Sequence, residues 1–346
     1  MLKSYSSKAI ASKARAMFGQ SLTPDDYSEL MKRTTVPEVA AYLRDNTHYA
    51  HTLEHVDLNS IHRGQLENLL RNERYERYQR LIHYDFSRQA GFYQYVYLWD
   101  EIEQIINLLR YIGAGSEGEY HVYGQVSPKF CSYDMNALLH ARSYDDVREV
   151  LRNTPYDSIL APYVLREEED KNKLDLSAIE RDLTTYYYRQ IFRHIDKQFG
   201  GSTGKKLRQL FLMRIDAENI ASAYRLRRFF KSSPEAIKNC LLPFETPNRK
   251  LIERIATGDP GGMVEILKNS RMGAEASEDD LEFIENLTLR LRHKYTKKML
   301  RYSTYPPVSL VAYITQLEVE LTNIINIIEA IRYQLAPADI AKILIL

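Results

Sequence analysis

Two glycine-rich segments have the composition of loops that bind phosphate groups. Gly113 to Gly118 has the spacing of a dinucleotide-binding loop, which needs a strand before it and a helix after it to hold pyrophosphate. A helical pattern, Ile102 to Ile112, precedes it instead, so we interpret Gly113 as a helix C-cap. Gly200 to Lys206 lacks the first glycine and the final Ser or Thr of a Walker loop. We expect a turn between helices there, and no cofactor at either segment.

Three histidines have a spacing that a metal site can use. His48, His51 and His55 follow one another at steps of three and four residues, which places imidazoles on one side of a helix. The neighbouring carboxylate, Glu54, points elsewhere on such a helix. Without a converging fourth group, we interpret these residues as ordinary, partly exposed histidines and predict no metal.

The chain is rich in tyrosine, with 26 residues that include Tyr186 to Tyr188 and the alternating Tyr93, Tyr95 and Tyr97. Such rings can stack on the bases of single-stranded nucleic acid. A formal net charge of only +1 removes the general attraction that a nucleic-acid binder uses. We therefore assign the tyrosines to helix packing and protein interfaces, where a ring with one polar end is common.

Catalytic signatures are absent from the sequence. No Ser/His/Asp or Cys/His set is recognisable, and no pair of carboxylates is marked out for acid–base work. We expect neither catalytic residues nor a small-molecule substrate. An enzyme with its site at a junction between structural units is an alternative, and it predicts a closed pocket with perturbed titratable groups.

The elements that would position these residues are helices. Apolar residues recur at steps of three and four, with almost no internal Gly or Pro, in several long segments. The segments are Gln65 to Tyr84, Ser177 to Phe199, Lys205 to Phe230, Glu278 to Tyr302 and Val308 to Leu335. Only Glu119 to Val126 resembles a short extended piece. The pattern predicts an all-α fold.

Helix starts and breaks are marked by capping residues, glycines and prolines. Thr23-Pro24-Asp25-Asp26 combines an N-cap hydroxyl, a proline at the first helical position and an acid at the third. Ser177 with Glu180 has the pattern of a capping box. The predicted breaks are Gly113 to Gly118, Arg166 to Lys173, Gly200 to Gly204, Ser232 to Pro234, Gly258 to Gly262 and Pro306-Pro307.

Composition favours a folded protein of a reducing compartment. Cys131 and Cys240 are the only cysteines and lie far apart, so they indicate neither a disulfide framework nor a thiolate metal site. The first residues lack the unbroken apolar stretch of a signal peptide. Polar residues interrupt the apolar segment Val308 to Ile331, so we expect no membrane span. Work at a membrane would then depend on partners.

Short sequence patterns recur in the same order along the chain. The first runs from an N-cap residue to a leucine eight positions later and then to a polar exit, after which a tyrosine or methionine follows. The starts are Thr35, Ser143 and Asp259, and the residues after the exits are Tyr49, Tyr156 and Met272. Since the starts are separated by roughly one third of the chain, they predict a repeated structural unit.

A second pattern is an apolar residue followed by glutamate early in a long helix, and a third is an acid with an amide three positions later. The glutamates of the second pattern are Glu67, Glu180 and Glu285. The third pattern pairs Glu101 with Gln104, Asp216 with Asn219, and Glu320 with Asn323. Arg110 and Arg225 lie six residues after the amide, where the last copy has Glu329. We expect these acids and amides to satisfy neighbouring helix ends within each unit.

The repeats predict three helical units of similar length. We place them at residues 1–116, 117–231 and 232–346, with terminal helices that pack across units. Because the amides and arginines differ between copies, we do not expect exact threefold symmetry.

The chain resembles the C subunit of the V/A-type rotary ATPases, which is the d subunit in eukaryotes. The resemblance rests on Ser7 to Gly19 with Leu22, Thr23 and Tyr27, on the Leu-Arg-Asn-Thr-x-Tyr exits, and on Asp216 to Arg227. It runs along essentially the whole chain. It implies three similar domains arranged as a funnel about a pseudo-threefold axis.

The resemblance further implies a non-catalytic subunit, without cofactors, that connects the central rotor stalk to the membrane proteolipid ring. It would sit in the cytoplasm, peripheral to the membrane, and transmit torque for ATP-coupled proton or sodium transport. We predict Arg225, Arg227 and Arg228 as stalk-facing residues because they cluster on one helix. The alternative is a helical-repeat adaptor of another assembly, which would share the repeats and differ in its partners.

Overall fold

Helices are the only regular elements in the part of the chain that the computed structural model describes. That part comprises residues 2–83, 90–115, 131–163, 175–270 and 284–346, and no strand occurs within it. The predicted all-α fold is therefore confirmed. The possible extended piece at Glu119 to Val126 and the break at Arg166 to Lys173 lie outside the described residues.

The helices are of two kinds, long rods and short helices that join them. In chain order they are α1 (Leu2–Phe18), α2 (Pro24–Leu30), α3 (Val36–Asn46), α4 (Ala50–Leu53), α5 (Arg63–Ile82), α6 (Ala90–Tyr93), α7 (Tyr95–Gly113), α8 (Met135–His140), α9 (Tyr144–Val150), α10 (Pro155–Leu160), α11 (Leu176–Gln198), α12 (Gly201–Arg228), α13 (Pro234–Cys240), α14 (Arg249–Thr257), α15 (Met263–Lys268), α17 (Ile284–Tyr302), α18 (Pro306–Arg332) and α19 (Pro337–Ile343). Short 3-10 helices, η2 (Ala161–Tyr163) and η3 (Pro260–Gly262), follow α10 and precede α15.

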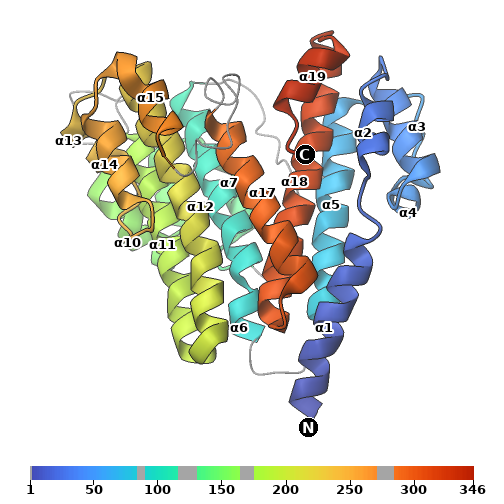
Figure 1. Cartoon of the computed structure of the whole chain (residues 1–346), viewed down its shortest axis with the longest axis horizontal. Helices are drawn as coiled ribbons and strands as arrows, with labels where there is room; N and C mark the ends of the chain where they lie inside the picture. The colour runs from blue at the N-terminus through green and yellow to red at the C-terminus, as the bar shows by residue number, and fades with distance from the viewer. Residues whose placement is uncertain (1, 84–89, 116–130, 164–174, 271–283) are drawn as a thin grey trace.

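The long helices pack side by side in pairs. α18 lies against α5, α7 against α11, and α12 against α17, while α1 runs along α18. Figure 1 shows the long helices fanning out from the lower end of the molecule, where the N-terminus lies. Among the short helices, α2 to α4 lie near the upper end on the right and α13 to α15 near the upper end on the left, whereas α6 lies near the lower end.

Hydrophobic side chains form one cluster around each set of short helices. One cluster joins Leu43 and Leu70 to Ile324 and Ile328 of α18, a contact between the two ends of the chain. A second, larger cluster includes residues of α7 to α11 and extends to α1, α5, α12, α17 and α18. A third joins Tyr224 of α12 to the helices from α13 to α17. Burying such side chains stabilises the fold by about 25 cal/mol per Å² of apolar surface removed from water.

These contacts define what we call the modules. The first module contains α18, α19 and α2 to α5, the second contains α7 to α11, and the third contains α12 to α17. Each module thus begins on one long helix and ends on another, and the first is completed by the last helices of the chain. The division of the chain at residues 116 and 231 stays a prediction.

The predicted start of α2 is confirmed in detail. Thr23 Oγ1 accepts a hydrogen bond from the backbone N–H of Asp26, and the Asp26 carboxylate accepts one from the backbone N–H of Thr23. Pro24 occupies the first helical turn, where its missing N–H costs nothing.

The predicted capping box at Ser177 is wrong. α11 begins one residue earlier, and the Asp175 carboxylate accepts from the backbone N–H of Ala178. Ser177 therefore lies inside the first turn of α11. An aspartate two residues upstream serves equally well as an N-cap, and it leaves Glu180 free to bond elsewhere.

The predicted turn at Gly200 to Gly204 is shorter than expected, because α12 starts at Gly201 rather than near Lys205. Glycine is required here by close packing, since a Cβ on Gly204 would lie 2.5 Å from the carbonyl oxygen of Phe199. Gly201 adopts a left-handed φ of 55°, which glycine tolerates. These two positions let α11 and α12 meet with almost no connecting loop.

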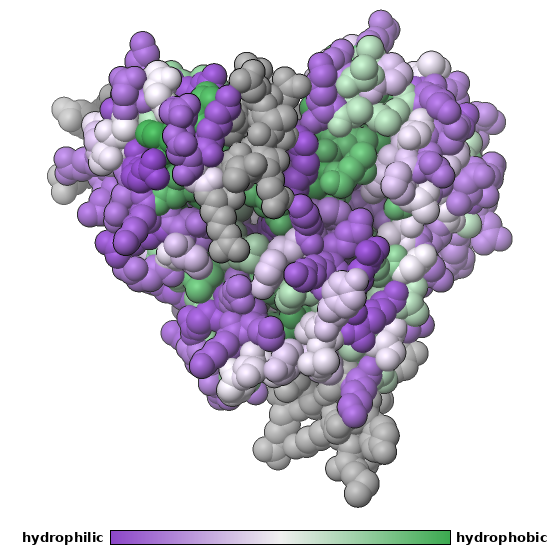
Figure 2. All heavy atoms as spheres, viewed as in Figure 1, coloured by the Kyte–Doolittle hydropathy of each residue, from purple (hydrophilic) through white to green (hydrophobic). Residues whose placement is uncertain are grey.

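α18 is the one helix of the described residues that is long and apolar enough to cross a membrane. However, 78% of its most apolar window is buried inside the protein. Its apolar surface is covered by α1, α5 and α17, so it is the core helix of the fold. The face seen in Figure 2 is largely hydrophilic, with hydrophobic residues gathered over the upper part of α18.

Candidate functional site

The repeated acids and amides lie on α7, α12 and α18, the helices on which the modules begin. All six side chains are buried: Glu101, Gln104, Asp216, Asn219, Glu320 and Asn323. Buried polar groups need hydrogen-bond partners. The partners show what the repeat does.

Two of the amides clasp the backbone of a residue that follows a short helix. The Asn219 side chain accepts from the N–H of Leu242 at 2.8 Å and donates to its carbonyl at 3.1 Å. Asn323 makes the same pair of bonds with Ile345, both at 2.8 Å. Each amide thereby bonds to both the N–H and the carbonyl of one residue, as a neighbouring β-strand would. It holds the chain after α13 or α19 against its long helix. Gln104 is buried at the equivalent place on α7.

Two of the acids bind the tyrosine at the exit of the first sequence pattern. Glu101 accepts from Tyr156 Oη at 2.5 Å and from the backbone N–H of Ser132 at 2.6 Å. Glu320 accepts from Tyr49 Oη at 3.1 Å and from the backbone N–H of Leu22 at 2.8 Å. Each acid therefore ties together the start and the middle of one module. Burial raises the pKa of both carboxyls, and these hydrogen bonds oppose that effect.

The third acid has different partners. Asp216 accepts from the backbone N–H of Asn248 at 3.3 Å and from its side-chain amide at 3.1 Å. The tyrosine of the other copies is replaced in sequence by Met272, which has no hydroxyl and lies outside the described residues. The third acid thus keeps a bond to the chain just before a short helix, α14, and its module has no tyrosine at the exit position of the sequence.

Ion pairs connect the third sequence pattern to the second. Arg110 of α7 contacts Glu180 of α11 at 2.5 Å. Arg225 of α12 lies 3.7 Å from Glu285 of α17. In each case an arginine near the end of one long helix meets the glutamate near the start of its neighbour.

The copy that carries Glu329 in place of arginine obtains its positive charge from the other helix. Arg63 of α5 contacts Glu67 at 2.5 Å and also binds Glu329 of α18. One guanidinium therefore bridges two carboxylates. The junction still pairs an arginine with a glutamate across the two long helices, but here the arginine is on α5 and the glutamate on α18. This explains physically why the third sequence copy departs from the other two.

A charged cavity, which we call the central cavity, lies between the modules. It has a volume of about 430 Å³ and is lined by α5, α7, α12, α17 and α18 together with Ile345. The walls carry four arginines and four glutamates, together with apolar residues such as Trp99 and Ile325. The charged residues are Arg71, Arg74, Arg214, Arg292, Glu103, Glu218, Glu285 and Glu318.

Comparison with protein families identifies the chain. The family model described as ATP synthase (C/AC39) subunit matches residues 10–343. The chain belongs to this family. The match runs through all three modules, and it confirms the resemblance to the C subunit of the V/A-type ATPases. No curated protein matched the sequence.

The three arginines predicted to face the stalk in this C/AC39 subunit have different surroundings. Arg227 donates to the carbonyls of Gly258 at 2.7 Å and Ser232 at 2.9 Å, so it holds the third module together. Arg228 stacks on Tyr224 and on the exposed Phe229. Arg225 is more than half exposed. The stalk-facing role stays a prediction, and only Arg225 and Arg228 offer it an accessible charge or ring.

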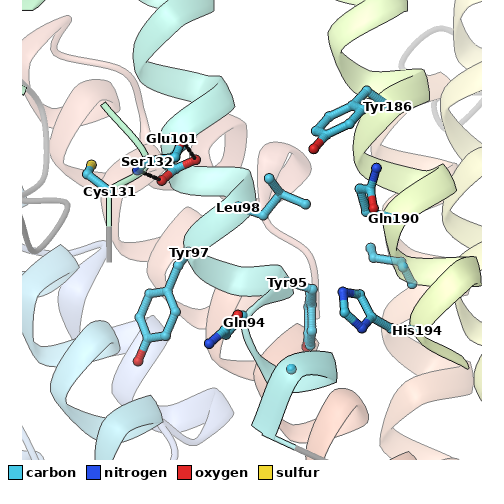
Figure 3. Close-up of a pocket in the computed structure, with 12 residues that line it drawn as sticks. Gln94, Tyr95, Tyr97, Leu98, Glu101, Cys131, Ser132, Tyr186, Gln190 and His194 are labelled. Atoms are coloured by element: carbon cyan, nitrogen blue, oxygen red, sulfur yellow. Dashed lines mark hydrogen bonds between the residues drawn. The ribbon is translucent and has the colours of Figure 1, made fainter. Parts of the chain in front are cut away.

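The C/AC39 subunit has a second pocket, of about 400 Å³, between α7 and α11. Figure 3 shows Gln94, Tyr97, Tyr186, Gln190 and His194 around it, with Glu101 bonded to Ser132. Its acid is thus already engaged in the repeated junction.

Burial also raises the pKa of the thiol of Cys131, in the same wall, to about 12. A thiol that stays protonated is a poor nucleophile. The pocket therefore lacks an activated nucleophile among its described residues.

The three spaced histidines do not share an environment. His48 is enclosed, with Nδ1 2.9 Å from the carbonyl of Gln20, and burial lowers its pKa to about 4. The His51 side chain is 87% exposed and lies 3.5 Å from Glu54. His55 is exposed.

The central cavity was missed from the sequence. Its charges are spread over five helices, and none of them forms a short motif. The nearest signal was the interruption of the apolar run of α18 by Glu318, which predicts a polar contact but not its partners.

Proposed function

We propose that this chain is the non-catalytic central-stalk subunit of its rotary ATPase. It forms a socket between the rotor shaft and the membrane proteolipid ring and transmits torque for ATP-coupled proton or sodium transport. The observation that carries the proposal is the family match over residues 10–343. The repeated junctions support the mechanical part.

Torque transmission needs parts that keep their positions under load. The clasps at Asn219 and Asn323 bind the chain after α13 and α19 to the long helices α12 and α18, and the ion pairs at Arg110 and Arg225 join one long helix to the next. Three modules held in this way favour a stiff funnel with a charged interior. The shaft would seat in that interior and the ring on another face.

A non-catalytic role agrees with the chemistry of the buried acids. Glu101, Asp216 and Glu320 each accept hydrogen bonds from backbone groups, so they serve as structural ties. Since α18 is buried in the core, we propose that the subunit works in the cytoplasm and is held at the membrane by the rest of the complex.

The test is a pull-down of the tagged full-length chain from gently solubilised membranes, followed by identification of the retained proteins. We expect recovery of the rotor-stalk subunits and the proteolipid ring. A preparation that retains a different assembly and no ATPase subunits would contradict the proposal and support an adaptor.

A further inference from the structure

The central cavity contains an arginine whose guanidinium has no hydrogen bond among the described residues. Arg292 projects from α17, and its side chain is only 12% exposed. Its nearest carboxylate oxygen, on Glu318, lies 3.6 Å away, and the Arg292 side chain makes no hydrogen bond in the part of the chain that the structure describes. A buried guanidinium presents five N–H donors, which normally find acceptors. Arg292 therefore has unused donors at the cavity wall.

The neighbouring charges do not compensate for this arginine. Arg214 lies 3.8 Å from the same Glu318 oxygen, so two guanidiniums share one carboxylate. Burial together with the nearby Arg214 lowers the pKa of Arg292, as expected for a cation that lacks full neutralisation. The Nε atoms of Arg71 and Arg74, on the α5 wall, are also buried without an acceptor among the described residues.

The remaining glutamates of the cavity have other partners. Glu218 accepts from Arg214 at 3.3 Å and from Tyr188 Oη at 2.8 Å. Glu285 pairs with Arg225, and Glu103 acts electrostatically on Arg74. Although the cavity has equal numbers of arginines and glutamates, the buried charged atoms in its described wall that lack a hydrogen-bond partner are the Nε donors of Arg71, Arg74 and Arg292.

We propose that this cavity receives a carboxylate of the rotor shaft, carried by an acidic side chain, and that Arg292 binds it. The inference rests on the proposed function and adds the chemistry of recognition. The planar fork of a guanidinium matches a carboxylate in two parallel hydrogen bonds. The apolar walls at Trp99, Leu289 and Ile325 suit a side chain with an aliphatic stem better than a hydrated free ion.

The test measures the affinity of the purified full-length chain for the purified central-stalk subunits of the same ATPase. Arg292→Gln is the variant, and Arg301→Gln, an exposed arginine on the same helix, is the control. We expect Arg292→Gln to bind the stalk about tenfold more weakly or worse, about 1.4 kcal/mol. The control should bind as the unmodified chain does.

Thermal unfolding of the free variants separates binding from folding. Removing a buried charge that has no hydrogen bond should leave the midpoint of Arg292→Gln unchanged or raise it. Loss of stalk affinity in a chain of equal or greater stability would support a recognition role. Equal affinities for the variant and the unmodified chain would overturn the inference while the proposed function stands. If the unmodified chain fails to bind the stalk, both fail.

A titration with sodium sulfate at constant ionic strength distinguishes a free anion from a partner. Sulfate should compete with the stalk for the unmodified chain and should have no such effect on Arg292→Gln. Sulfate binding that needs Arg292, together with unchanged stalk affinity in the variant, would reduce the cavity to a small-ion site and overturn the proposal.

Glu318→Gln provides an opposite variant. It removes the single carboxylate that Arg214 and Arg292 share, so the free chain should be less stable, and its affinity for the stalk should increase. A decrease in affinity would contradict the proposed role of the cavity.

Discussion

Asn219 and Asn323 each satisfy both backbone groups of one downstream residue. These clasps matter because a buried N–H or carbonyl that loses its partner pays its full desolvation cost. An asparagine amide can form two hydrogen bonds with one extended residue because it carries both a donor and an acceptor. An aliphatic side chain has neither, and a carboxylate has acceptors only.

Replacement of a clasp residue should therefore destabilise its module. We expect Asn323→Ala to lower the free energy of unfolding by about 2 to 4 kcal/mol, since the N–H and carbonyl of Ile345 lose their acceptor and donor. Chemical denaturation measures this difference. Asn326→Ala is the control, because Asn326 makes one bond of 3.4 Å and is only partly buried. Equal losses for both variants would contradict the clasp.

A buried histidine gives a pH prediction of definite sign. Burial, aided by Lys297 and Arg292, lowers the pKa of His293 to about 4, so the ring is neutral in the folded chain. Above about pH 6.5 neither state is protonated. As the pH falls from 6.5 to 4, the unfolded chain takes up a proton first, so stability decreases.

His293→Gln should remove this loss, which we expect to be about 2 kcal/mol at pH 4 after allowance for solvent screening. Denaturation at pH 7 and at pH 4 checks it, with exposed His51→Gln as the control. A variant that loses as much stability between these pH values as the unmodified chain would show that His293 plays no part.

For single residues, the sequence predicted which acids and amides would form polar contacts but not which groups they would bind. The acid and amide spacing predicted polar ties within each unit. That prediction is wrong for Glu101 and Asn219, which bond to Ser132 and Leu242 of the following unit, whereas Asn323 bonds to Ile345 of its own. The backbone groups among their partners could not be predicted because they leave no mark on residue type, whereas the other partner of Glu101, Tyr156, is one of the repeated sequence positions. The charges of the central cavity were missed for a related reason, since they meet only after folding.

Between elements, the ion pairs join one long helix to the next. Arg63 serves two carboxylates at once, and Glu67 is deeply buried. We expect Arg63→Gln to cost about 2 kcal/mol, less than for a fully buried pair because Arg63 is one third exposed. Denaturant titration measures the loss.

The double variant Arg63→Gln with Glu329→Arg should recover much of that stability. It places the arginine on α18, as Arg110 and Arg225 are placed on α7 and α12. A double variant no more stable than Arg63→Gln alone would mean that the three junctions are not equivalent.

The junction of α11 and α12 depends on the absence of a side chain. Gly204→Ala should destabilise the chain by about 2 kcal/mol or more, although alanine favours helices by about 1 kcal/mol, because its Cβ would collide with the Phe199 carbonyl. Thermal unfolding tests this, and Gly262→Ala, where a Cβ meets open space, is the control. A Gly204→Ala chain as stable as the control would contradict the close approach.

Helix identity and length were predictable because apolar periodicity extends over many residues, as in α5, α11 and α18. The starts of α11 and α12 were less predictable. Glycine at Gly201 and Gly204 indicates a loop by composition, yet close packing required it inside a helix. Whether a glycine marks a loop or a close contact inside a helix depends on the tertiary packing around it, which local sequence does not show.

For the whole molecule, the exposed positions of the third module test the predicted stalk surface. Arg225→Glu should weaken binding of the purified stalk subunits about tenfold, since it replaces an accessible positive charge. Arg249→Glu, also more than half exposed and paired with Glu245 and Glu253, is the control. Unchanged affinity for Arg225→Glu would remove Arg225 from the stalk surface.

The repeat itself was visible in the sequence, whereas the way its copies combine was not. The acid and amide of each copy bind groups in the chain that follows, so the last copy on α18 completes the first module. Sequence order suggests three consecutive blocks, but hydrogen bonding links each block to the next and the last to the first.

The completion of the first module by α18 and α19 separates the order of synthesis from the order of folding. The apolar faces of α3 and α5 emerge early from the ribosome, yet Ile324, Ile327 and Ile328, which cover them, are made near the end. The second and third modules use helices that are neighbours in sequence and can assemble as they appear. During synthesis, the apolar faces of α3 and α5 would therefore stay exposed until α18 has been made. We expect a chaperone to bind the nascent chain at these faces.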